Sequence, residues 1–432
     1  MALPEQCDVV VIGGGPAGSV AASQLAMAGF SVVLVEKEKH PRLTVGESII
    51  PQFWRFADLI GATAAIESEG FIPKAGGLAL WRGALRQLKF SDFGYSRPGL
   101  HVERDCFDFL LLERTRANGV HVFEQTAVTR IDGYLDAPVV RYRTRDNEPG
   151  EIRASYVIDA SGQSAVLARQ LGIREYDPDI RFMSLWGYYE GGRYLTVEGE
   201  VQPFARRREI PPATVTSTIG DWGWVWHIVL REKVSVGIVL TPETLQAFKA
   251  VRDTPEAKFQ GLVAGSPIVG ELLQDARFQG EMFGIRDYAY KPVQLAVGNC
   301  YLAGDAAAFV DPINSAGVVF GMFAGFAAAW SIAESLRKPA RRDELRGRYC
   351  KIYGDRLALF RLLGLPPDAK GVGMAIEAAA DAVNMTGASE QRLMLLQAVL
   401  NSRAEGIETV LDRFGLSKQV VSRTIPVPKL AA

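Results

Sequence analysis

The sequence predicts an α/β fold in which a parallel-sheet domain is interleaved with a second, β-sheet domain and followed by a C-terminal helical region. Three observations predict this arrangement. Residues 8–40 alternate a strand-like apolar run, a glycine-rich turn, a helix-like segment and a second apolar run. Period-two patterns, which are typical of strands in a sheet, dominate from about residue 181 to residue 240. An apolar run that ends in a glycine turn returns at residues 300–305, which brings the chain back to the first domain.

The N-terminal unit combines a strand at residues 8–12, the turn Gly-Gly-Gly-Pro-Ala-Gly at residues 13–18, and a helix expected over residues 19–28. A second apolar run at residues 31–35 ends at Glu36. The first glycine permits a tight turn, the second lets backbone amides approach a pyrophosphate, and the third allows the helix to pack on the strand. The helix N-terminus favours negative charge, and a carboxylate at this spacing can accept hydrogen bonds from ribose hydroxyls. The unit therefore predicts a Rossmann-like dinucleotide-binding domain.

The remaining segments divide the chain into three parts. The pattern predicts a helix over residues 104–117, a strand at residues 120–123 and a buried strand at residues 155–160. After about Arg341 it predicts helices as far as Phe414, followed by an irregular tail. We therefore expect a discontinuous dinucleotide-binding domain of residues 1–70, 100–180 and 280–335, a β-sheet substrate domain of residues 71–99 and 181–279, and a C-terminal helical region of residues 336–432.

Composition and charge exclude several classes of protein. The chain carries 48 Lys and Arg against 49 Asp and Glu, so its net charge of −1 gives no reason to expect a nucleic-acid partner. The four cysteines are too far apart for a disulfide framework or a metal-binding motif, and the four histidines are scattered. We therefore expect a cytoplasmic protein without a bound metal. The N-terminus lacks a basic region and already forms the first strand, which argues against a signal peptide.

Residues 315–333 contain no charged side chain and imitate a membrane span. Gly317, Gly321 and Gly325 recur at every fourth position, the spacing at which small residues let two helices approach closely. The run is rich in Ala and Gly rather than Leu and Ile, and the sequence contains no second such run. We therefore expect a helix buried inside the fold and no membrane span.

A second motif supports the dinucleotide site. Gly304-Asp305 follows an apolar run, and Asp311-Pro312 and Gly317 precede the apolar helix. A carboxylate at the end of a strand can accept hydrogen bonds from sugar-like hydroxyls, and the N-terminus of the following helix favours a negative or electron-rich group. Joined to the glycine turn at the N-terminus, this motif strengthens the prediction of a bound dinucleotide.

These motifs resemble the FAD-dependent monooxygenase superfamily with the hydroxybenzoate-hydroxylase fold. The matching segments are residues 13–18, Arg42, Gly46-Glu47-Ser48, Arg104 with Phe107-Asp108, residues 159–162, and Gly304-Asp305 to Gly317. Within the superfamily the chain is most similar to the flavin-dependent halogenase branch. Phe-Ile-Pro-Lys-Ala-Gly at residues 71–76 is similar to the segment that carries the halogenase lysine, and Trp-Val-Trp-His-Ile at residues 224–228 matches most of the Trp-x-Trp-x-Ile-Pro signature.

The resemblance implies an FAD-dependent oxidoreductase and assigns residues to the cofactor. Arg42 and Arg104 are expected near a phosphate or the flavin rim, and Glu47 and Ser48 near the isoalloxazine ring. The full set of expected FAD-binding residues is Gly13, Gly15, Ala17, Gly18, Glu36, Lys37, Arg42, Ser48, Arg104, Asp305, Pro312 and Gly317.

The resemblance also implies catalytic groups. Lys74 matches the halogenase lysine beside the substrate, where a buried amine can hydrogen-bond hypochlorous acid or activate a phenol or indole. Glu47 and Ser315 complete the expected catalytic set. The expected substrate pocket contains Trp224, Trp226 and His227. Alternating tryptophans can also simply pack one face of a sheet, and a lone histidine is more often a structural residue.

Two departures from the halogenase pattern bear on the reaction. Val229 stands in place of the signature proline, and Ala316 leaves the segment before Gly317 without a second hydroxyl residue. We therefore expect first a monooxygenase in which a flavin hydroperoxide hydroxylates an electron-rich aromatic ring, including an indole or tryptophan presented by a peptide or partner protein. One alternative is a flavin-dependent halogenase of a phenol, pyrrole or indole. The other is a flavin reductase of the geranylgeranyl-reductase kind.

The source of electrons follows from the number of nucleotide motifs. The sequence contains one complete Gly-x-Gly-x-x-Gly motif, at residues 13–18, and no obvious second nucleotide pocket. The resemblance therefore implies that a separate flavin reductase, or another NAD(P)H source, supplies the electrons. The expected aromatic substrate is free, or bound to a carrier or a protein.

Overall fold

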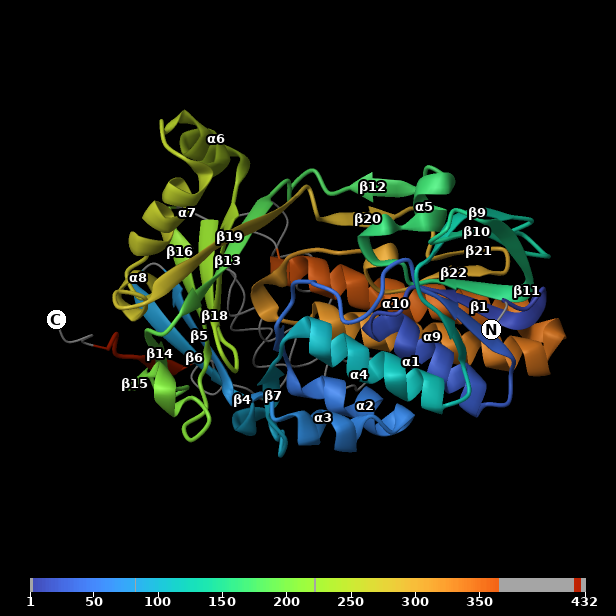
Figure 1. Ribbon diagram of the computed structural model, residues 1–432, viewed down its shortest axis with the longest axis horizontal. Helices are drawn as coiled ribbons and strands as arrows, with labels where there is room; N and C mark the ends of the chain where they lie inside the picture. The colour runs from blue at the N-terminus through green and yellow to red at the C-terminus, as the bar shows by residue number, and fades with distance from the viewer. Residues whose placement is uncertain (1–2, 82, 221–222, 365–422, 429–432) are drawn as a thin grey trace, which may run out of the picture.

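The computed structural model describes residues 3–81, 83–220, 223–364 and 423–428, and this part of the chain contains two eight-stranded sheets. Figure 1 shows the sheet with the N-terminal strand on the right and the second sheet on the left. Each sheet combines strands from distant parts of the sequence, because the chain passes from one sheet to the other more than once. Residues far apart in sequence therefore meet where the two sheets approach each other.

The first sheet has the strand order β21-β22-β11-β1-β2-β8, and β10 and β9 extend it from β11. The five strands from β22 to β8 are parallel. The apolar runs of β1 and β2 are buried on both faces, as expected for a parallel sheet covered by helices. The strands are β1 (Gln6–Ile12), β2 (Val32–Val35), β8 (His121–Phe123), β9 (Thr126–Asp132), β10 (Val139–Thr144), β11 (Pro149–Asp159), β21 (Ala296–Val297) and β22 (Cys300–Leu302).

Four long helices pack around this sheet, namely α1 (Pro16–Met27), α4 (Arg104–Ala117), α9 (Gly317–Arg337) and α10 (Arg342–Gly364), and a short helix packs on β9. Helices α1 and α9 are in close contact, since a Cβ at Gly325 would lie 2.1 Å from the Ala17 carbonyl oxygen. Helix α9 is long and apolar enough to cross a membrane, but 67% of its most apolar stretch is buried inside the protein. It is therefore a core helix, which is the position that the sequence predicts.

The second sheet has the order β19-β13-β18-β17-β16-β5-β6-β23. One face packs on three helices through an apolar core that includes Val225 and Phe259, and the opposite face carries Trp224 and Trp226. The helices are α6 (Pro242–Ala250), α7 (Pro255–Ala264) and α8 (Val269–Leu272). The strands are β5 (Gly76–Trp81), β6 (Ala84–Lys89), β13 (Met183–Glu190), β16 (Thr214–Ile219), β17 (Gly223–Val229), β18 (Val234–Leu240), β19 (Arg277–Arg286) and β23 (Arg423–Ile425).

A small three-stranded sheet in the order β3-β7-β4 carries three polar residues close together. In β3 (Ser48–Ile49), Ser48 pairs with His101 of β7 (Gly99–His101), and Ile72 of β4 (Ile72–Lys74) pairs with His101 from the other side. The sheet therefore brings Ser48, Lys74 and His101 into one unit. The remaining elements are α2 (Trp54–Ile60), α3 (Thr63–Glu69), α5 (Val166–Gln170), and the strand pairs β12 (Arg174–Tyr176) with β20 (Tyr290–Pro292) and β14 (Arg193–Leu195) with β15 (Val201–Pro203).

The α/β fold predicted from the sequence is confirmed, with a Rossmann-like sheet, a second sheet and a C-terminal helix. Strands of the second sheet come from both of the ranges expected for the substrate domain, and the boundaries of the domains stay a prediction. Helix α10 lies in the expected helical region, whereas the helices predicted between residue 365 and Phe414 lie outside the described residues. The prediction of an irregular tail was wrong at Arg423–Ile425, because these residues form β23 on the edge of β6.

Candidate active site

The glycine turn after β1 is packed tightly on one side and open on the other. Gly13 has a φ of +105°, and a Cβ there would lie 2.3 Å from the Ala160 carbonyl oxygen, so this position requires glycine. A Cβ at Gly18 would lie 1.9 Å from the Gly13 carbonyl oxygen, which fits its expected role in helix–strand packing. A Cβ at Gly15 would meet the Arg42 guanidinium at 3.4 Å and no other described atom within 4 Å. The turn is therefore accessible to a ligand at Gly15.

The carboxylate of Glu36 is fixed beside this turn. The Gly14 amide donates a hydrogen bond to Glu36 Oε2 at 2.7 Å, and the Glu38 amide donates to Oε1 at 2.9 Å. Each carboxylate oxygen can accept more than one hydrogen bond, so the group keeps acceptor capacity for ribose hydroxyls. Glu36 lines the same cavity as Gly15, which is the arrangement that a bound dinucleotide needs.

A cavity of about 670 Å³ runs from the glycine turn to the inner face of the second sheet, where Trp186, Trp224 and Tyr288 line it. Its volume lies in the range of cofactor pockets. All of the predicted FAD-binding residues except Gly18, which packs behind the turn, line this cavity. They are Gly13, Gly15, Ala17, Glu36, Lys37, Arg42, Ser48, Arg104, Asp305, Pro312 and Gly317.

Two tryptophans in the cavity wall, Trp186 and Trp224, carry buried indole donors without a hydrogen-bond partner among the described residues, which indicates a polar ligand. The indole Nε1 of Trp224 is buried and has no hydrogen-bond partner among the described residues. A buried donor without a partner costs about 1–3 kcal/mol, so such donors are uncommon in folded proteins. Because Trp224 lines the cavity, this donor fits a ligand that carries acceptor atoms on a ring.

Two arginines are held at the cavity by a buried carboxylate. Arg104 donates to both carboxylate oxygens of Asp108, at 2.9 and 3.0 Å, and to the Val45 carbonyl at 2.8 Å. Arg42 Nη1 lies 3.5 Å from Asp108 Oδ2. Burial raises the pKa of Asp305 to about 6, against the opposing effect of the Arg104 charge. Asp108 therefore positions both cations, although the predicted set of site residues does not include it.

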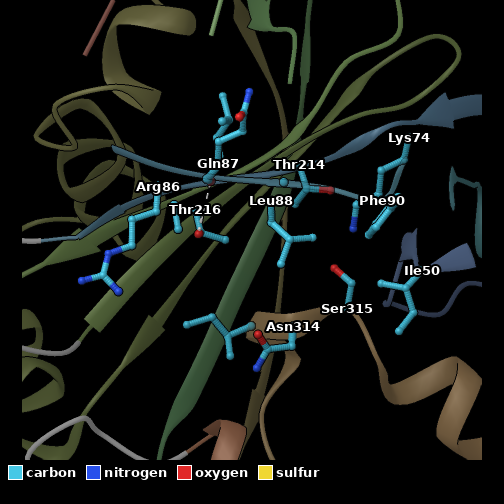
Figure 2. Close-up of a pocket in the computed structure, with 14 residues that line it drawn as sticks. Ile50, Lys74, Arg86, Gln87, Leu88, Phe90, Thr214, Thr216, Asn314 and Ser315 are labelled. Carbon is cyan, nitrogen blue, oxygen red and sulfur yellow. Dashed lines mark hydrogen bonds between the residues drawn. The ribbon is translucent and has the colours of Figure 1, made fainter. Parts of the chain in front are cut away.

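Lys74, the last residue of β4, is buried at the end of a smaller cavity of about 110 Å³. Its Nζ donates to Ser48 Oγ at 2.8 Å, and Ser315 Oγ donates to the same oxygen at 3.0 Å. Figure 2 shows Lys74 and Ser315 reaching toward each other from different walls of the cavity. Burial lowers the pKa of the Lys74 amine to about 7. The structure therefore brings two of the expected catalytic residues together through Ser48.

The smaller cavity combines apolar surface with the Lys74 amine and other polar side chains. Gly77 and Ala79 of β5 leave room along one wall, and Leu88 of β6 and Phe90 supply apolar surface (Figure 2). The centroid of the Phe90 ring lies 5.4 Å from Lys74 Nζ. Apolar surface beside a buried amine can hold an aromatic ring and orient it by a polar contact. Arg86, Gln87 and Asn314 add further polar groups to the lining of this cavity. Both cavities are lined by Thr214, Thr216, Ile313 and Ser315, which therefore form the boundary between them.

Glu47 lies in the wall of the large cavity rather than beside Lys74. The Tyr188 hydroxyl donates to Glu47 Oε1 at 2.8 Å, and burial raises the pKa of Glu47 to about 6. Glu47 is absent from the lining of the smaller cavity, among the residues that the structure describes. The structure thus places this expected catalytic residue on the cofactor side of the site.

The three residues expected in the substrate pocket point in two directions. Trp224 and Trp226 line the large cavity, with their ring centroids 5.7 Å apart. The side chain of His227 lies on the opposite face of β17, the face that packs on the helices through Val225. In the sheet, His227 is the backbone partner of Val215 on β16. Burial there lowers the pKa of His227 to about 4. The expectation that His227 borders the substrate pocket is therefore corrected, because successive side chains of a strand alternate between the faces of a sheet.

The sequence prediction missed a polar residue at the boundary of the cavities. Thr214 Oγ1 lies 2.8 Å from Ser48 Oγ and 2.7 Å from His101 Nε2. No motif singles out this threonine, since its role depends on β16 pairing beside β5. His101 carries a sequence signal only as one of four histidines in the chain.

Comparison with known proteins identifies the family. Residues 6–186 match the family described as FAD binding domain. The tryptophan 2-halogenase of Chondromyces crocatus is 34% identical over 336 residues, which cover 77% of this chain and 62% of that protein. The flavin-dependent halogenase armH1 of Armillaria mellea is 31% identical over 382 residues, which cover 84% of this chain and 72% of that protein. The chain belongs to the flavin-dependent halogenase family.

A solved structure agrees with this assignment. The myxobacterial chondrochloren halogenase CndH is 27% identical and superposes with a TM-score of 0.76, covering 97% of this chain and 99% of that one. The halogenase-family protein is therefore an FAD-dependent oxidoreductase, as the sequence predicts. Its large cavity fits FAD, because the open glycine turn, the fixed Glu36 and the unpartnered Trp224 donor follow one another along it. The comparisons favour the halogenase alternative and give no specific support to hydroxylation.

Proposed function

We propose that the protein is a flavin-dependent halogenase that places chlorine or bromine on an electron-rich aromatic ring. The observation that carries the proposal is the position of Lys74, whose buried amine lines the small cavity and is joined through Ser48 to the boundary of the cofactor cavity. The relatives support it, since a tryptophan halogenase and several other flavin-dependent halogenases are similar over most of this chain.

The cofactor would lie in the large cavity. The Gly15 backbone and the N-terminus of α1 would hold the pyrophosphate, Glu36 the ribose, and Trp224 the polar edge of the ring. When bound and reduced, FAD supplies, with O2 and halide, the hypohalous acid that is the halogenating agent. We infer that a separate flavin reductase delivers the electrons, and that the protein works in the cytoplasm.

The chain's own contribution is to hold the ring and to move one proton. Because burial lowers the pKa of Lys74 to about 7, a large fraction of this amine is neutral near pH 7. Its lone pair can accept the proton of a ring O–H or N–H while the ring carbon attacks the halogen. The ring carbon gains the halogen, the oxygen of the hypohalous acid leaves as hydroxide, and Lys74 holds the proton from the ring O–H or N–H. The hydrogen on the halogenated carbon then shifts to the ring oxygen or nitrogen, which breaks the carbon–hydrogen bond and restores the aromatic ring. Return of the proton from Lys74 to the hydroxide gives water.

Apolar walls make this chemistry selective. Leu88 and Phe90 would cover the faces of a bound ring and displace water from it, and the boundary residues Thr214 and Ser315 would separate the ring from the cofactor side. Exclusion of water strengthens the polar contact with Lys74 and reduces the loss of oxidant to side reactions. The proposed substrate is a phenol, pyrrole or indole, either free or attached to a carrier or a protein.

The test is the halide dependence of product formation. Purified protein would be supplied with reduced FAD, O2 and a panel of phenols, pyrroles and indoles, with chloride, with bromide or without halide. We expect products that carry the halogen isotope pattern in mass spectrometry and that require halide. The departures at Val229 and Ala316 make direct hydroxylation the outcome to exclude. Product formed without halide, with a mass gain from labelled O2, would overturn the halogenase proposal.

A further inference from the structure

Lys74 is the first member of a chain of buried hydrogen bonds that leads away from both cavities. Lys74 Nζ donates to Ser48 Oγ at 2.8 Å, and Ser48 Oγ lies 2.8 Å from Thr214 Oγ1. Thr214 Oγ1 lies 2.7 Å from His101 Nε2, and His101 Nδ1 lies 3.1 Å from the Val229 carbonyl oxygen. All four side chains are almost fully buried, so water does not compete for these contacts.

The last bond of the chain fixes the position of its hydrogens. A carbonyl oxygen can only accept, so His101 Nδ1 must carry a hydrogen and donate it to Val229. Burial, together with the charge of Lys74 and the nearby His227, holds the pKa of His101 well below its ordinary value. The ring is therefore neutral, and its Nε2 is an acceptor.

The remaining hydrogens then follow in order. Thr214 has one hydroxyl hydrogen and donates it to His101 Nε2, so its oxygen accepts from Ser48. The single hydrogen of Ser48 is thereby directed to Thr214. Its oxygen is left to accept from Lys74 and from Ser315, which are the two remaining contacts.

We propose that His101 and Thr214 act as positioning residues, which hold Ser48 as an obligatory acceptor and so keep the lone pair of the Lys74 amine off Ser48 and available to a substrate in the small cavity. A serine free to rotate could turn its own hydrogen toward the amine nitrogen and occupy that lone pair. The His101–Thr214 arm prevents this rotation. Figure 2 shows Thr214 and Lys74 on the same side of the cavity in which the lone pair would meet a substrate.

The arrangement of charges around Lys74 agrees with this role. Burial is the cause of the lowered pKa of Lys74, and the pKa of His101 is lowered by burial and by the charges of Lys74 and His227. Arg86 is the other charged residue in the lining of the small cavity. Lys74 has no ion pair with a carboxylate in the part of the chain that the structure describes, and its other close contact is the Phe90 ring. The orientation of Ser48 therefore decides whether the lone pair of the neutral amine is occupied or free.

The experiment measures the nucleophilicity of Lys74 in the protein without FAD, halide or substrate. Cyanate is small enough for the cavity and reacts with neutral amines. Its rate of carbamylation at Lys74 would be followed by peptide mass spectrometry from pH 6 to 10, relative to the exposed Lys249. We expect Thr214→Val to lower the rate at Lys74 on the order of tenfold above pH 8, because the freed serine hydrogen bonds the amine. Thr214→Ser should restore the rate.

A matched control comes from the same strand. Thr216 also lines both cavities, but its hydroxyl faces the Leu78 carbonyl at 3.5 Å and lies outside the chain of bonds. Thr216→Val should therefore leave the carbamylation rate of Lys74 within about twofold of the wild type, because the long hydrogen bond to the Leu78 carbonyl that it loses does not involve Ser48 or Lys74. An unchanged rate in Thr214→Val, or an equal loss in Thr216→Val, would overturn the proposal.

A second pair of variants covers the case in which Thr214→Val does not fold. His101→Gln keeps one acceptor and one donor on the side chain and should retain the rate at Lys74, whereas His101→Leu removes both and should lower it. Equal rates in the two His101 variants would contradict the proposal. The importance of this positioning role for catalysis rests on the proposed function, but the labelling experiment does not. If the protein does not halogenate, the Thr214 effect on labelling can still be present. If the Thr214 effect is absent, halogenation can still occur.

Discussion

At the scale of single residues, burial sets the charge states on which the candidate site depends. The pKa of Lys74 falls to about 7, and those of Glu47 and Asp305 rise to about 6. These shifts have one cause, since removal from water disfavours the charged form of an amine and of a carboxylate alike. The amine therefore gains the ability to accept a proton near neutral pH. The two carboxylates remain mostly charged there, which suits contacts to hydroxyls on the cofactor side.

The first prediction concerns the Lys74 amine. Lys74→Ala should lower product formation about a hundredfold or more, as is typical when a proton acceptor is lost. Reoxidation of reduced FAD by O2 should continue, because the cofactor contacts lie in the other cavity. The measurement is product by mass spectrometry beside flavin absorbance. Lys89→Ala is the matched control, since Lys89 pairs with Glu198 at 2.6 Å outside both cavities and should leave product formation unchanged.

The role of Lys74 also predicts how the rate of halogenation changes with pH. A lowered pKa means that the neutral amine appears as the pH rises through about 7, so single-turnover halogenation should rise over that range. Lys74→Arg, which stays charged, should show no such rise in any residual activity. Full turnover in Lys74→Ala, or a wild-type rate that falls as pH passes 7, would remove Lys74 from the mechanism.

At the scale of elements, the spacing of apolar residues predicts a helix or strand correctly when its structure depends on its own sequence alone. The apolar runs of β1 and β2 and the helix α4 could be predicted from local pattern, and so could the glycine turn. The strand β23 could not, because three residues at the end of a long segment have no periodicity and depend on the edge of β6. The prediction for His227 was wrong for a different reason: it treated the tryptophan motif as one unit, whereas alternation along a strand already places His227 on the face opposite to Trp226.

The second prediction belongs to the packing of α1 on α9. Gly325→Ala should destabilise the protein by about 1–3 kcal/mol, because the added Cβ would lie 2.1 Å from the Ala17 carbonyl and force the helices apart. Displacement of α1 should also weaken FAD binding, since its N-terminus opens on the cofactor cavity. Urea unfolding and FAD titration would measure the two effects.

A second helical glycine provides the comparison for this substitution. A Cβ at Gly347 in α10 would meet no described atom within 4 Å. Gly347→Ala should therefore be neutral or stabilising by about 0.5–1 kcal/mol, through the higher helix propensity of alanine. If both variants unfold at the same urea concentration as the wild type, the close contact of α1 and α9 does not contribute to stability.

At the scale of the whole molecule, the site exists because distant segments converge between two sheets. Ser48 and Ser315 are 267 residues apart in sequence and share a hydrogen bond, and Ser48 meets Thr214 across 166 residues. The glycine turn, Glu36, Lys74 and Ser315 could each be predicted because their motifs are local. Their mutual geometry could not, and neither could Thr214, whose partners come from three other strands. A cofactor that spans the large cavity would contact both sheets and should stabilise the molecule as a unit.

The last prediction tests that coupling through Gly15. Its backbone is extended, with φ −76° and ψ −177°, and a Cβ there would meet the Arg42 guanidinium at 3.4 Å, so a larger residue is compatible with the fold. Gly15→Val should yield a folded, colourless protein, because its side chain would occupy the approach to the pyrophosphate. In wild-type protein, FAD at about 100 times its Kd should add about 2.7 kcal/mol of stability. The variant should lose this gain while its melting temperature without FAD stays near that of wild type.

Gly13→Val is the contrast: its Cβ would clash with the Ala160 carbonyl oxygen at 2.3 Å, so it should lower stability even without FAD. A Gly15→Val protein that keeps a wild-type FAD-induced shift would place the pyrophosphate away from this turn and require another path for the cofactor through the cavity.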